Sequence, residues 1–168
     1  MGLLGRIFGK KGGESPMSQG QVLRKKMLEG SPREMGFEPS DEFPKVAGVI
    51  ADMPMSGIEV SIFGSATADG SLYTSSQFGI IGGCQHEGAR KAALELTRKA
   101  NEFYDEATPA QDTAYPPTGT VRFYLMGFDG LRFLDAPEKS AIEGTHRYSP
   151  LYGCAQMLMT QLRIASGG

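Results

Sequence analysis

The sequence predicts an α+β protein with a single domain, in which helices flank a mostly antiparallel central sheet. Three observations support this prediction. Two pairs of segments with strand character are each joined by an Asp-Gly dipeptide, which is typical of β-hairpins. Segments with helical periodicity lie before, between and after these pairs. The length of 168 residues suits one domain with an appendage. The expected element order is therefore α-ββ-α-ββ(β)-α.

The first half of this domain is predicted as one helix and one hairpin. Residues 46–53 carry apolar side chains at i, i+3, i+4 and i+7, which indicates a helix ended by Pro54. In 58–66, every second residue from Ile58 is apolar, which indicates a strand. We expect residues 72–74 to return as its partner across a turn at Asp69-Gly70.

Two further helices are predicted from their apolar spacing. The clearest one starts near His86 and keeps helical spacing until Pro109 closes it. The last helix starts at Ser149-Pro150, which suit an N-cap and a first helical position. Its buried face is predicted to contain Leu151, Ala155, Leu158, Met159 and Leu162.

Between these helices lies the second pair of strands. Residues 121–127 and 131–134 are predicted to form a hairpin around Asp129-Gly130. Residues 137–148 are ambiguous, and a short edge strand is one interpretation of them.

The N-terminal region differs from the rest in charge and composition. Residues 1–39 are predicted to be a basic, flexible arm and linker, and residues 40–168 the globular domain. Six basic residues and one acidic residue occur in 1–26, whereas the remainder has a net charge of −7. The glycine-rich stretch 9–20 reads as a linker, and 21–29 as a short basic helix.

The first eleven residues have the composition of a peripheral membrane anchor. Their apolar side chains could share one face of a short helix with basic side chains around it, as in interfacial helices. The alternative is an unstructured terminus. The residues predicted to contact a membrane are Leu3, Leu4, Ile7, Phe8, Lys10 and Lys11.

Composition and charge exclude several classes of function. A net charge of −2 gives no basis for nucleic-acid binding. We find neither the apolar run of a secretory signal nor the roughly 20 apolar residues of a spanning helix. We therefore expect a cytoplasmic protein whose two cysteines are reduced thiols.

One segment could bind an anion. Glycines in 79–83 precede a helix, so the amides of Gly82 and Gly83 could hold a phosphate, assisted by His86 and Arg90. Their spacing matches neither of the standard phosphate-binding glycine motifs. The alternative is that the glycines permit a tight entry from strand to helix.

The cysteines and histidines suggest two weaker hypotheses. Cys84, His86, His146 and Cys154 have the side chains that zinc prefers, but their spacing matches no standard structural site. Cys84 at a helix start could act as a nucleophile with His86 as base, although residues two apart diverge on a helix. We expect no cofactor, and an enzyme built around Cys84 and His86 remains the second alternative function.

The element order over residues 43–165 resembles roadblock-type dynein light chains and profilin-like folds. The run Asp69-Gly70-Ser71-Leu72-Tyr73, followed by Ile80-Ile81-Gly82-Gly83 and His86-Glu87, is similar to a family of uncharacterised bacterial proteins. The first resemblance implies a scaffolding module that dimerises. We therefore expect a non-enzymatic module that binds itself or another protein. The first alternative is a small-ligand or anion sensor using residues 79–90.

Overall fold

A computed structural model of the chain describes residues 16–76, 79–81 and 85–167. The strands of this part are β1 (Val46–Met55), β2 (Ile58–Ser65), β3 (Gly70–Thr74), β4 (Gly79–Ile81), β5 (Thr108–Pro109), β6 (Thr120–Gly127) and β7 (Gly130–Pro137). The helices are α2 (Gln19–Glu29), α3 (Glu87–Phe103), the 3-10 turn η1 (Tyr104–Glu106), α4 (Glu138–Glu143) and α5 (Ser149–Ala165). The strands form one antiparallel sheet in the order β4-β3-β2-β1-β6-β7-β5.

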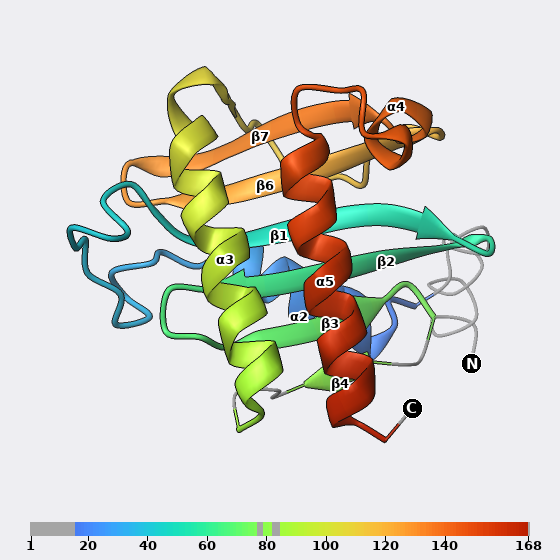
Figure 1. Cartoon of the computed structure of the whole chain (residues 1–168), viewed down its shortest axis with the longest axis horizontal. Coiled ribbons are helices and arrows are strands. Elements are labelled where there is room, and N and C mark those ends of the chain that lie inside the picture. The colour runs from blue at the N-terminus through green and yellow to red at the C-terminus, as the bar shows by residue number, and fades with distance from the viewer. Residues whose placement is uncertain (1–15, 77–78, 82–84, 168) are drawn as a thin grey trace, which may run out of the picture.

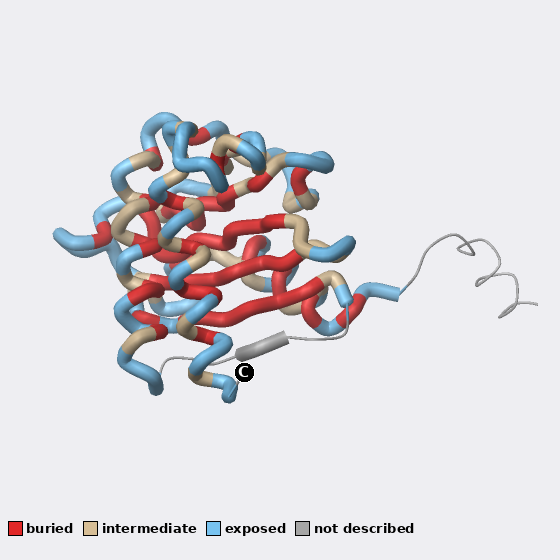
Figure 2. The backbone as a smooth tube through the Cα atoms, turned by 45° about the vertical axis from the view of Figure 1, so that its right-hand side comes forward, coloured by how far each residue is buried: buried red, intermediate tan, exposed pale blue. Residues whose placement is uncertain are grey.

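Helices cover both faces of this sheet. In Figure 1, α3 and α5 lie side by side in front of the strands, and α2 lies behind them. The larger apolar core lies between the sheet and the α3–α5 layer, and a smaller one lies between the sheet and α2. In Figure 2 the central strands are buried along most of their length. The predicted class, a single α+β domain with a mostly antiparallel sheet, is confirmed.

The predicted helix at residues 46–53 is wrong, because this segment is strand β1. β1 is central in the sheet, and every residue from Val46 to Met53 is buried. A strand that is covered on both faces loses the polar alternation that identifies strands in a sequence. Pro54 does not end a helix. It lies where pairing with β6 has stopped at Asp52 while pairing with β2 continues, and proline suits such an edge.

Both predicted hairpins are confirmed, as β2–β3 and β6–β7. Gly130 has the expected positive φ of 134°. In the β2–β3 turn, however, the left-handed residue is Ala68, with φ of 69°, and Gly70 is already part of β3. Gly70 meets a different need, since a Cβ there would lie 3.1 Å from Leu158 Cδ1 on α5.

The long helix and the last helix are confirmed as α3 and α5. α3 ends at Phe103, earlier than the predicted limit at Pro109, and η1 follows it. The ambiguous stretch after β7 contains the short helix α4 and not an edge strand. All five residues predicted to face the core from the last helix are buried.

α2 belongs to the layer behind the sheet, although its residues were assigned to the N-terminal arm. Its Arg24 and Leu28 are buried, and Gly20 lies so close to β3 that a Cβ there would collide with the Thr74 carbonyl oxygen. The predicted boundary near Ser40 therefore does not separate α2 from the sheet. The predicted membrane-contact residues lie outside the described residues, and that prediction stays open. No helix of the described part is long and apolar enough to cross a membrane.

A surface ion pair joins η1 to the start of α5. Arg147 Nε and Nη2 each donate to a Glu106 carboxylate oxygen at 2.6 Å, and the Tyr148 hydroxyl donates at 2.9 Å. The hydrogen bond from Arg147 is the main reason why the pKa of Glu106 falls from 4.5 to about 2.

We expect this pair to contribute stability above pH 4.5 that is lost as the pH falls towards 2, because a depressed carboxyl pKa favours folding when the carboxyl is ionised. Urea midpoints of the wild type and Glu106→Gln should therefore differ above pH 4.5 and converge near pH 2. Because the pair is exposed, about 1 M salt should reduce the difference. A constant difference across this pH range would contradict the assignment.

Candidate interaction groove

An apolar hollow lies on the outer side of the helix layer, between α3 and α5. It has a volume of about 490 Å³. We call it the α3–α5 groove. α3 contributes Gly88, Lys91, Ala92 and Glu95, and α5 contributes Pro150, Gly153, Cys154, Met157 and Gln161.

Small residues create this groove. Gly153 is exposed, and a Cβ added there would meet nothing within 4 Å, so one turn of α5 presents bare backbone to solvent. Gly88 leaves room for the end of the Gln161 side chain, whose amide oxygen lies where a Cβ at position 88 would be. The underlying Ala92 is buried. The groove is therefore a shallow apolar depression between two helices that both pack firmly on the sheet.

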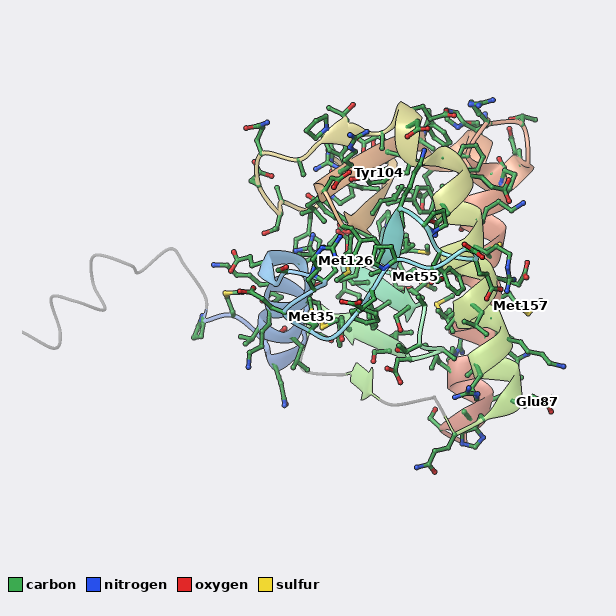
Figure 3. The ribbon with its side chains drawn as sticks, turned by 90° about the vertical axis from the view of Figure 1, so that its left-hand side faces the viewer. Met35, Met55, Glu87, Tyr104, Met126 and Met157 are labelled. Atoms are coloured by element: carbon green, nitrogen blue, oxygen red, sulfur yellow. The ribbon has the colours of Figure 1, made fainter. Side chains whose placement is uncertain are left out.

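Met157 projects beside this depression. Met157 is one of the large apolar residues of the described part that are exposed, and 55% of its surface is accessible to solvent. Figure 3 shows it on the outer side of the helix layer, away from the sheet. Methionine is flexible and polarisable, and it is common at protein-binding surfaces. Met157 thus gives α5 a protruding apolar side chain, whereas Gly153, one turn earlier on the same helix, has no side chain.

Charged side chains border the groove along α3. Lys91 and Glu95 are one helical turn apart and exposed. Lys91 forms an ion pair with Glu87 at 3.4 Å, and Glu95 accepts a hydrogen bond from Arg98. Figure 3 places Glu87 at the lower end of the same helix. The border of the groove therefore presents one positive and one negative charge in sequence.

Cys154 lines the groove, but the environment of its thiol is unsuited to a nucleophile. Burial is the main reason why the pKa of its thiol is raised above 9.0. A thiol with a raised pKa is mostly protonated at neutral pH, and the protonated form is a poor nucleophile. The groove consequently favours non-covalent contact over covalent chemistry.

The predicted anion site falls partly outside the described residues. Gly82, Gly83 and Cys84 lie there, so their arrangement with His86 and Arg90 is not described. His86 is the N-cap residue of α3 and makes no side-chain capping bond, and Arg90 is exposed in the first turn. The anion site and the nucleophile at Cys84 therefore both stay predictions.

Two of the residues considered as zinc ligands, His146 and Cys154, lie in different environments. His146 Nδ1 accepts a hydrogen bond from the Tyr148 amide at 3.0 Å, and its ring packs against the Tyr148 ring. Cys154 lies in the groove on α5. Within residues 16–76, 79–81 and 85–167, no three side chains of His, Cys, Asp or Glu gather as a metal site would require.

A buried polar centre lies on the opposite face, beneath α2. Arg24 Nε donates to Asp52 Oδ1 at 3.0 Å, and Arg24 Nη2 donates to Oδ2 at 2.6 Å. The Ser61 hydroxyl donates to the same carboxylate, and the Tyr115 ring stacks on the guanidinium at 4.0 Å. Because Asp52 is fully buried and has these partners, its role is to hold α2 on the sheet.

Sequence reasoning missed both the groove and this centre. The prediction for the last helix covers its buried face and leaves out the outward positions of Gly153 and Met157. That signal was available, because the same periodicity places the two residues together on the outer face. Asp52 gave no signal, since it was assigned to a helix.

No protein-family model, curated protein or solved structure matches this chain. The resemblances to roadblock-type proteins and to an uncharacterised bacterial family therefore stay expectations.

Proposed function

We propose that this chain is a non-enzymatic protein-interaction module that associates with a second copy of itself through the α3–α5 groove. The observation that carries the proposal is the exposed Met157 next to the side-chain-free surface at Gly153. A protruding apolar side chain and a hole of the same chemical character on one face allow two identical faces to fit one another. Each copy would contribute one Met157 and receive the other.

The size of the helix layer indicates a weak dimer. Helices of 17 residues are about 25 Å long, and two of them side by side are about 20 Å wide. Such a face buries about 500 Å² per copy, or about 1,000 Å² in total, which is at the lower limit of specific interfaces. We therefore expect a dimer that forms at micromolar concentration and dissociates on dilution.

The test is Gly153→Gln, which fills the hole with a polar side chain. An exposed glycine within a helix destabilises it by about 0.5–1 kcal/mol relative to alanine, and glutamine is a good helix former. The variant should thus raise the melting temperature of the monomer. It should also abolish the dimer in sedimentation equilibrium, leaving the 18.0 kDa species.

Val22→Gln on α2 supplies a matched control. Val22 is 48% exposed and lies on the helix behind the sheet, opposite the α3–α5 layer, so its loss should leave self-association unchanged. A wild type that remains at 18.0 kDa throughout the micromolar range would refute the proposal. So would a Gly153→Gln variant that associates as strongly as the wild type.

A further inference from the structure

The two helices of the groove have a register that is compatible with two-fold symmetry. They run antiparallel, with Gly88 opposite Gln161 at one end and the Phe103 ring 5.4 Å from the Tyr148 ring at the other. From these two contacts, the midpoint between Lys91 and Glu95 on α3 lies level with the midpoint between Gly153 and Met157 on α5. The two levels agree to within about two residues, or about 3 Å at 1.5 Å per residue.

Consider a two-fold axis at this level that lies in the plane of the interface and is perpendicular to the helices. It places α3 antiparallel against α3 of the second copy, and α5 antiparallel against α5 of the second copy. Residues at equal distances from the axis then face one another. Met157 of one copy faces Gly153 of the other, and Lys91 of one copy faces Glu95 of the other. One axis thus satisfies both the apolar pair on α5 and the charged pair on α3.

We propose that Lys91 and Glu95 determine the specificity of the self-complex, because Lys91 of each copy pairs with Glu95 of the other copy. This inference rests on the proposed self-association through the α3–α5 groove. Because both residues lie at the border of the apolar surface, like charges at these positions oppose a wrong partner or register, and opposite charges select a second copy. Each dimer contains two such contacts.

Charge reversal tests the pairing. Lys91→Glu alone and Glu95→Lys alone should each weaken self-association about tenfold, because both contacts in the dimer become repulsive. An equimolar mixture of the two variants should associate about as well as the wild type, since their charges are complementary. The double variant Lys91→Glu/Glu95→Lys should also regain self-association. Sedimentation velocity with one variant fluorescently labelled distinguishes mixed from identical pairs.

Lys25 and Glu29 on α2 provide the matched control. They form an exposed i,i+4 ion pair at 3.8 Å with the same order of charges, on the opposite side of the sheet. Lys25→Glu and Glu29→Lys lose a comparable intrahelical pair, and they should leave association unchanged. Thermal melts of every variant establish that each remains folded.

The outcomes separate this inference from the function on which it rests. Restored association in the mixture and in the double variant, but not in either single variant, supports the pairing. If all charge variants associate like the wild type, or if the mixture is as weak as the single variants, the pairing is overturned while self-association through the groove stands. A wild type that never associates overturns both.

Discussion

Replacing Arg24 by methionine is expected to destabilise the domain by about 3–5 kcal/mol, the usual cost of removing one partner from a buried ion pair. Asp52 is fully buried on the central strand β1, and Arg24 donates hydrogen bonds to both of its carboxylate oxygens, at 3.0 Å from Nε to Oδ1 and at 2.6 Å from Nη2 to Oδ2. Methionine keeps the apolar stem of Arg24 but removes its hydrogen bonds, while the Ser61 hydroxyl still donates to the carboxylate. The free energy of unfolding, measured with urea at pH 7, checks this expectation.

The pH dependence of the Arg24→Met variant has a defined sign. Burial already raises the pKa of Asp52, and the hydrogen bonds from Arg24 and Ser61 oppose that shift. Without Arg24 the folded-state pKa rises further, so the variant favours the protonated carboxyl. A raised folded-state pKa contributes stability at low pH that is lost as the pH rises through that pKa. The loss relative to wild type should therefore be smaller near pH 4 than at pH 7.

A double variant provides the control for this buried pair. Arg24→Met/Asp52→Leu removes both charges, and an apolar replacement of a buried ion pair is often neutral or stabilising. The double variant should recover most of the stability lost in Arg24→Met. A single-variant loss below about 1 kcal/mol, or a double variant no better than the single one, would contradict the anchoring role of the pair.

Leu158→Ala is expected to cost about 4–5 kcal/mol, at the upper end of the range for buried leucines. Leu158 is fully buried on α5, and its two methyl groups lie against Gly64 on β2 and Gly70 on β3. The glycines have no side chains that could move into the cavity, so the site collapses poorly. Urea unfolding of the variant measures the loss.

The neighbouring residue is the control for this core position. Met157→Ala removes an exposed side chain and should change stability by less than about 0.5 kcal/mol, while weakening self-association. A rescue is also available, since a Cβ at Gly64 would lie 3.0 Å from Leu158 Cδ2. Gly64→Ala should be destabilising in the wild type and less so, or beneficial, with Leu158→Ala. Equal effects in both backgrounds would show that the two positions do not share one cavity.

The extent to which the sequence predicted the fold depended on whether each segment has one buried face. α5 has one buried side and one exposed side, and all five of its predicted core residues are buried. Both predicted hairpins are present. Such segments reveal their structure because water on one face imposes a periodic pattern.

β1 and α2 show the opposite case. β1 is covered on both faces, so its apolar residues carried no alternation and were mistaken for a helix. α2 is mostly polar, and it is held on the sheet by a few buried residues, including Arg24. Arginine is usually exposed, and nothing local in 19–29 indicates that Asp52 accepts its guanidinium from 28 residues away.

The sequence by itself therefore determined the class of this protein, its two hairpins and its two long helices, because local periodicity records which side of a segment meets water. Tertiary structure decided where α2 packs, that residues 46–55 form the central strand, and which residues of α3 and α5 share the groove. These features depend on contacts between segments distant in sequence, such as Arg24 with Asp52 and Gly88 with Gln161. Pairings of this kind arise when the elements pack, and no local pattern encodes them.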